Sequence, residues 1–186
     1  MLVNPEALRV VVDFLNQHRI PHMVIGGLAN AVWGEVRMTR DADFKVSTDL
    51  LPSDFRRLVL NHFAERQTGL PQHLRSSFVI HIWALPDMAV DLLMSVFDYE
   101  RQAIARAVDA TIEGIPARVC TAEDLIIHKG IANRTQDWMD IEGVLLRQGN
   151  KLDVAYVRDW LTQFAEALEK PELLTRFNEL YNRVRE

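Results

Sequence analysis

Cysteine is nearly absent from this chain, since Cys120 is the only one among 186 residues. An intramolecular disulfide and a multi-cysteine zinc site are therefore both excluded. Long apolar runs are also missing, because the longest uncharged stretches fall far short of the ~20 residues that span a bilayer. The first residues include Glu6 and no basic segment, which is unlike a signal peptide. We therefore expect a cytoplasmic protein that has no contact with a membrane.

Positive charge is scarce as well. The chain has 21 Lys and Arg against 26 Asp and Glu, which gives a net charge of −5. The acidic excess is spread along the chain. Residues 1–110 have 11 basic and 13 acidic side chains, and residues 111–186 have 10 basic and 13 acidic ones. Because affinity for long nucleic acid comes from neutralising phosphates, this balance argues against a general nucleic-acid-binding protein. A local cationic pocket is compatible with it.

The remaining composition is that of an ordinary globular protein, with 48% hydrophobic and 25% charged residues. Patterns of strand and helix alternate over residues 1–120, whereas residues 121–186 show helix patterns only. Strands are predicted at 22–25, 42–46, 78–85 and 89–94, and a helix is predicted at 51–66. We therefore predict an α/β (α+β) fold in which a small mixed sheet is flanked by helices, with a helical C-terminal part packed on this core.

The most informative stretch begins at Gly26-Gly27, between a predicted strand and a predicted helix. Two glycines there allow backbone N–H groups to approach a ligand, and the following helix N-terminus favours an anion such as phosphate. On its own, the same pattern is more often simply a tight turn. Further along, Asp41 and Asp43 lie on one face of a predicted strand. Their repulsion is offset if they bind Mg²⁺, or is weak if they lie at a solvated strand end.

A third acid, Asp91, interrupts the apolar run 88–93. A charge in a buried strand needs a partner, which is either an arginine or a metal ion. If the strand of Asp91 neighbours that of Asp41 and Asp43, three carboxylates meet at one point. His81, in another apolar strand, is interpreted as a core histidine.

Together, the ordered set Gly26-Gly27, Asp41-Ala42-Asp43 and Asp91 resembles the nucleotidyltransferase superfamily, which has the polymerase-beta-like fold. Two departures are Gly27, where many members have serine, and the small Ala42. A narrower resemblance is to the AbiE-type abortive-infection toxin nucleotidyltransferases. It is based on two spaced motifs: Arg37-x-Thr39-x-Asp41-x-Asp43, and Lys129 followed by Arg134 and Asp137.

The resemblance implies a site for a nucleoside triphosphate and two Mg²⁺ ions. Asp41 and Asp43 would bind the metal, and Asp91 would complete the second metal position and help to deprotonate the attacking hydroxyl. Gly26 and Gly27 would cradle the β- and γ-phosphates.

It also implies roles for basic residues. Lys129 would neutralise triphosphate charge, Arg134 would bind phosphate or pair with Asp137, and Asp137 would orient Lys129 or Arg134. Arg40 would reach the nucleotide or the acceptor.

The predicted activity is an EC 2.7.7-type transfer of a nucleoside monophosphate to an acceptor hydroxyl. The acceptor is an RNA such as tRNA, a protein or a small molecule, and an antitoxin partner is implied if the chain is a toxin. The alternative is a catalytically inactive nucleotide-binding or protein-interaction module with the same fold.

Overall fold

The computed structural model describes residues 3–39, 41–69, 76–86 and 88–185. The chain forms two compact units. The first consists of Met1–Leu28 and Arg37–Cys120, and the second of Ala29–Val36 and Thr121–Glu186. A short segment from the N-terminal half thus belongs with the helical second unit.

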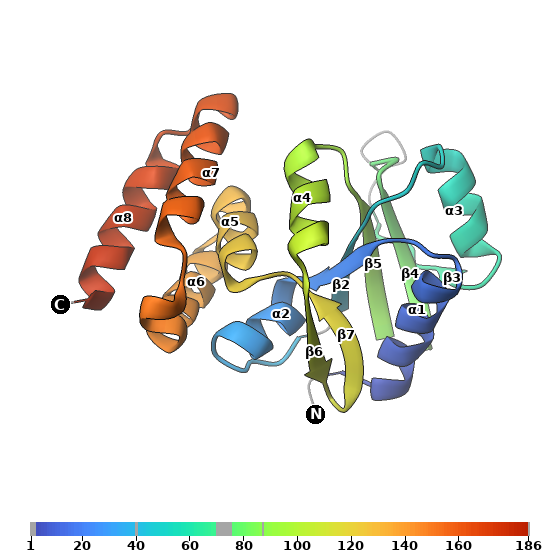
Figure 1. Ribbon diagram of the computed structural model, residues 1–186. Helices are drawn as coiled ribbons and strands as arrows, with labels where there is room; N and C mark the ends of the chain where they lie inside the picture. The colour runs from blue at the N-terminus through green and yellow to red at the C-terminus, as the bar shows by residue number, and fades with distance from the viewer. Residues whose placement is uncertain (1–2, 40, 70–75, 87, 186) are drawn as a thin grey trace. The chain divides into compact units, whose positions relative to one another are not determined.

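A seven-stranded mixed sheet forms the centre of the first unit (Figure 1). Its strands are β1 (His22–Ile25), β2 (Asp41–Val46), β3 (Ala64–Glu65), β4 (Val79–Leu85), β5 (Met88–Met94), β6 (Val108–Ile112) and β7 (Ile115–Val119). The spatial order is β3-β4-β5-β2-β1-β7-β6. The pairs β2–β5 and β1–β7 are parallel, and the other neighbours are antiparallel. This arrangement confirms the predicted α/β architecture with a mixed sheet.

The helices α1 (Pro5–Gln17), α3 (Pro52–Leu60) and α4 (Asp98–Arg106) lie wholly in the first unit. The side chain of Asn4 caps α1 by accepting a hydrogen bond from the Glu6 amide at 3.0 Å. Helices α1 and α3 lie together on one side of the sheet, and α4 lies on the other (Figure 1).

The two faces of the central strands differ in burial. Alternate residues such as Phe44, Ile80 and Leu92 are fully buried. Their neighbours Asp43 and Asp91 point to the opposite face and are only partly buried. The alternation therefore builds the core with one face and leaves acidic side chains accessible on the other.

The helix predicted at 51–66 is shorter than expected. The chain leaves α3 after Leu60 and adds β3 to the edge of the sheet beside β4. Phe63 is buried against Phe14 of α1, with ring centroids 5.1 Å apart. The Arg66 amide then donates to the His81 carbonyl at 2.9 Å. Tertiary packing overrides the local helix pattern here.

The second unit is helical. It contains α5 (Ala122–Ala132), α6 (Thr135–Gln148), a 3₁₀ turn (Gly149–Lys151), α7 (Val154–Ala167), α8 (Glu172–Arg185) and most of α2 (Gly26–Trp33). Thr121 caps α5 by accepting from the Asp124 amide at 3.1 Å, as the sequence predicts. Among the helices of the described ranges, none combines the length and apolar character needed to cross a membrane.

A buried ion pair between Lys45 of β2 and Glu100 joins the sheet to α4. Burial alone would raise the pKa of Glu100. The hydrogen bond and charge of Lys45, together with the Val96 and Phe97 amides, outweigh burial and lower this pKa below its ordinary value. The ionised carboxylate therefore stabilises the fold at neutral pH.

Glu100→Gln should lower the free energy of unfolding at neutral pH by roughly 1–3 kcal/mol, as for a hydrogen bond to a charged group. The difference in unfolding free energy between wild type and variant should become smaller as the pH falls through the pKa of Glu100 in the folded protein. Only the wild type has a carboxylate at this position to take up a proton. Urea unfolding over a pH series measures this, with exposed Glu166→Gln as control. If this difference stayed constant in acid, the ionised carboxylate of Glu100 would not be the stabilising group.

Candidate functional site

Three acidic side chains lie on the accessible face of the sheet. In the parallel pairing of β2 with β5, Asp43 is directly opposite Asp91. Asp41 lies two residues before Asp43 and therefore on the same face. Because adjacent strands are about 4.8 Å apart, the carboxylates of Asp43 and Asp91 extend side by side from neighbouring backbones.

Asp91 is held by two basic side chains from the β3–β4 side of the sheet. His81, its antiparallel partner on β4, approaches Asp91 Oδ1 with Nδ1 at 2.8 Å. The guanidinium of Arg66 pairs with the same oxygen. Within the described part of the chain, Asp91 Oδ2 has no hydrogen-bond or ion-pair partner. The predicted alternative of an arginine partner for Asp91 is thus realised by Arg66, on the side away from Asp43.

Sequence reasoning missed both partners of Asp91. Arg66 was expected in a helix, and His81 was interpreted as a core histidine, although its side chain is 27% exposed. The hairpin of β4 and β5 was predicted, but its register alone did not identify His81. Counting back from the pair Leu85–Met88 would place Ile82 opposite Asp91, and a register shift between Trp83 and Leu85 brings His81 there instead.

The two glycines make room for the acids. Gly26 has φ of +65°, and a Cβ on it would lie 2.1 Å from Asp43 Oδ2. A Cβ on Gly27 would lie 2.7 Å from Thr39 Oγ1. Glycine is therefore required at both positions by the packing of the chain's own side chains, whether or not phosphate binds there.

Thr39 orients the first acid. Its hydroxyl lies 3.0 Å from the Asp41 carbonyl oxygen and 3.2 Å from Asp41 Oδ1, both of which can accept its hydrogen. Asp41 Oδ2 has no partner among the described residues. Arg40, predicted to reach the nucleotide, lies outside the described residues.

The donor set fits Mg²⁺ in its chemistry, because hard divalent cations prefer carboxylate oxygens and both Asp41 and Asp91 have an oxygen without a described partner. The three acids are not gathered into a ready cage, however. No group of three His, Cys, Asp or Glu among the described residues is arranged to hold a metal. The geometry thus supplies carboxylate oxygens of the kind that Mg²⁺ prefers on one face, without a complete preformed centre among the described residues.

Lys129 belongs to the second unit and is buried, with 5% of its side chain exposed. Its ammonium pairs with Asp140 of α6 and lies 3.7 Å from Asp137 Oδ1. Gln136 donates to the other oxygen of Asp140 at 3.0 Å. These contacts occupy Lys129 in joining α5 to α6.

Arg134 lies at the start of α6, and its side chain is largely exposed. Its Nε donates to Asp137 Oδ2 at 2.7 Å, and its amide donates to the same oxygen at 3.2 Å. Asp137 thus contacts both Arg134 and Lys129.

Solved structures with a similar fold are nucleotidyltransferases. The antibiotic-resistance factor ANT(2'')-Ia is 15% identical, with a TM-score of 0.60 over 90% of this chain and 94% of that one. In its complex with adenylyl-2''-tobramycin, the same factor is 14% identical, with a TM-score of 0.55 over 89% of this chain and 99% of that one. The lincosamide antibiotic adenylyltransferase LnuA with lincomycin bound is 12% identical, with a TM-score of 0.51 over 77% of this chain and 98% of that one. These likenesses confirm the polymerase-beta-like fold.

No curated protein sequence matches the chain. A family model does: the family described as "Nucleotidyl transferase of unknown function (DUF2204)" matches residues 4–179, nearly the whole chain. The predicted enzyme class is thereby confirmed, and the chain belongs to this nucleotidyl transferase family.

Proposed function

We propose that the protein transfers a nucleoside monophosphate from a nucleoside triphosphate to a hydroxyl group of a small molecule. The observation that carries the proposal is the pairing of Asp43 with Asp91 across β2 and β5, with Asp41 on the same face. This arrangement puts carboxylate oxygens beside the turn at which α2 begins. Such oxygens suit the charge neutralisation on which phosphoryl transfer depends.

Each acid has a distinct part in the proposed reaction. Asp41 and Asp43 would hold Mg²⁺, which supplies charge neutralisation at the triphosphate when bound. Asp91 Oδ2 would accept the proton of the acceptor hydroxyl as its oxygen attacks the α-phosphorus and pyrophosphate leaves. Arg66 and His81 are positioning residues, because both bind Oδ1 and so fix the plane of the carboxylate.

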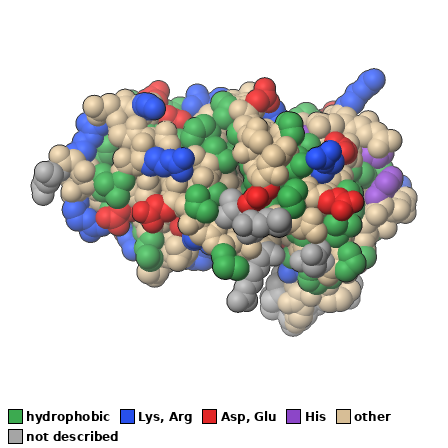
Figure 2. Space-filling view, turned by 90° about the horizontal axis from the view of Figure 1, so that it is seen from below, with side chains coloured by type: hydrophobic (Ala, Val, Ile, Leu, Met, Phe, Trp, Pro, Cys, Tyr) green, Lys and Arg blue, Asp and Glu red, His purple; other side chains and the backbone are tan. Residues whose placement is uncertain are grey.

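A small-molecule acceptor is favoured by two observations. The chain is acidic, with a net charge of −5, and both acidic and basic side chains are scattered over the face seen in Figure 2. A tRNA acceptor would call for a basic surface. ANT(2'')-Ia and LnuA, which have similar folds, form complexes with adenylyl-2''-tobramycin and with lincomycin. The AbiE-type resemblance, a toxin role with an antitoxin partner and a cytoplasmic location stay predictions.

The direct test is incubation of the protein with Mg²⁺ and each labelled nucleoside triphosphate, against panels of hydroxylated small molecules, bulk tRNA and the protein itself. Asp43→Asn should reduce transfer by about a hundredfold or more, because charge stabilisation dominates such reactions. Asp159→Asn, an exposed change on α7, is the matched control. Label that appeared on tRNA or on the protein, and not on a small molecule, would show that the proposed small-molecule acceptor is wrong. Nucleotide binding with no transfer to any panel would instead support the inactive module.

Gly26→Ala should abolish most transfer by displacing Asp43, since the new Cβ would lie 2.1 Å from Asp43 Oδ2. The matched control is Gly114→Ala. Gly114 also has positive φ, at +80°, but nothing lies within 4 Å of its added Cβ. Both variants should lose about 1–2 kcal/mol of folding free energy from backbone strain, and only Gly26→Ala should lose activity. Equal activity in the two would contradict the role of this contact.

Lys129→Met should lower the free energy of unfolding by roughly 3–5 kcal/mol, because Asp140 would be left buried without its cation, whereas Asp137 would keep Arg134. Adding Asp140→Asn should restore part of this loss. The double variant also tests the predicted contact of Lys129 with the triphosphate. A raised KM for the nucleotide in this stable protein would support that contact, and an unchanged KM would contradict it.

A further inference from the structure

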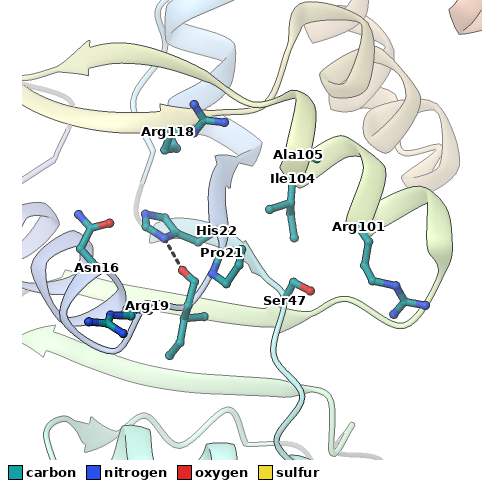
Figure 3. Close-up of a pocket in the computed structure, with 10 residues that line it drawn as sticks. Asn16, Arg19, Pro21, His22, Ser47, Arg101, Ile104, Ala105 and Arg118 are labelled. Carbon is teal, nitrogen blue, oxygen red and sulfur yellow. Dashed lines mark hydrogen bonds between the residues drawn. The ribbon is translucent and has the colours of Figure 1, made fainter.

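A cavity of about 550 Å³ opens in the first unit, at the far end of β1 from the glycine turn (Figure 3). In the pairing of β1 with β2, Ile25 is opposite Asp43, whereas His22, which lines the cavity, is opposite Val46. Three residue steps of a strand separate the two ends, which is about 10 Å. The cavity is therefore distinct from the acidic site.

The lining of this cavity is cationic. It includes Arg19, Arg101, Arg118 and His22, and the described residues that line it include no Asp or Glu. Three arginines without an acidic side chain in the described lining contrast with the acidic balance of the whole chain. The local potential therefore favours an anion.

The guanidinium groups of these arginines make only weak interactions with the described residues. Arg118 lies 3.5 Å from Asp109, and Arg101 pairs with Asp98 one helical turn away; both pairs are exposed. Exposed pairs of this kind contribute little. The side chain of Arg19 has no hydrogen bond or ion pair with any described residue.

Arg19 also adopts an unusual backbone conformation for its residue type. It follows α1 with φ of +54°, in the left-handed region where glycine is preferred at a helix end. The Ile20 amide donates to Leu15 O at 2.9 Å and closes the helix there. This bend directs the chain from α1 into β1 and brings Arg19 to the rim beside Asn16.

His22 lies in the same group, with Arg118 on one side and Asn16 and Arg19 on the other (Figure 3). Its side chain is buried, and Nδ1 lies 2.9 Å from Ile20 O. Burial lowers the pKa of His22, the hydrogen bond to Ile20 opposes this, and the charge of Arg118 lowers it further. An anion beside Arg118 would offset that charge, so anion binding and protonation of His22 should favour each other.

We propose that this cavity is a second ligand site, which binds a small phosphate-bearing molecule. Arg118 on one side of His22 and Arg19 on the other (Figure 3) would each offer a guanidinium to the ligand, because the planar guanidinium fork matches phosphate oxygens in charge and geometry. Asn16 adds a donor on the side of Arg19. Ile20, Pro21 and Ile104 form an apolar wall for the rest of the molecule. The concave shape and the volume suit a small ligand rather than a long nucleic acid.

The test measures binding of inorganic phosphate, pyrophosphate and a nucleoside monophosphate by calorimetry, with EDTA present and in the Asp43→Asn protein. These conditions separate the cavity from the acidic site, so the result does not depend on the proposed transfer activity. Arg19→Gln with Arg118→Gln should weaken binding roughly tenfold or more. The matched control is Arg57→Gln, an exposed arginine with one ion pair on α3, and it should bind as wild type does.

The imidazole signals of His22 provide a second readout by NMR. Phosphate should shift them and raise the pKa of His22, and binding should tighten as the pH falls through that pKa. If the double variant does not fold, Arg19→Gln alone, at an exposed side chain, serves the same purpose. Absence of millimolar binding, or binding unaffected by the arginine changes, would overturn the proposal. So would an RNA oligonucleotide that binds through these arginines and is not displaced by pyrophosphate.

Discussion

Two carboxylates extend from neighbouring strands because β2 and β5 pair in parallel with Asp43 opposite Asp91. Like charges at this spacing repel each other, and the repulsion persists in the folded state unless cations or hydrogen-bond donors offset it. The protein supplies Arg66 and His81 to Asp91. The early end of α3, which follows from the packing of Phe63 against α1, makes this possible, because Arg66 directly follows the edge strand β3.

The same sheet separates charge along β1. Its carboxyl end meets the glycine turn and Asp43, and its amino end begins at His22 among arginines. Opposite potentials at two ends of one short strand would favour a metal-bound substrate at one end and an anion at the other. Because β1 pairs with β2 over its whole length, ligands at the two ends would contact the same pair of strands.

The sequence predicted the features that depend on residues close together in the chain. Strand alternation gave the faces of Asp41 and Asp43, and the capping residue Thr121 gave the start of α5. The sequence could not predict Arg66, because the turn after α3 depends on the packing of Phe63 against α1. Nor could it show that Lys129 is buried, since its partner Asp140 lies on another helix.

The pairing of Asp91 with an arginine is compatible with a catalytic role because of how its oxygens are used. Oδ1 receives both Arg66 and His81, and Oδ2 has no described partner. Asp41 shows the same division, with Oδ1 bound to Thr39. A carboxylate fixed through one oxygen is oriented before substrate arrives, so little reorganisation is needed when the second oxygen acts. In the proposed reaction, the contacts that hold these acids would thus lower the barrier rather than block the site.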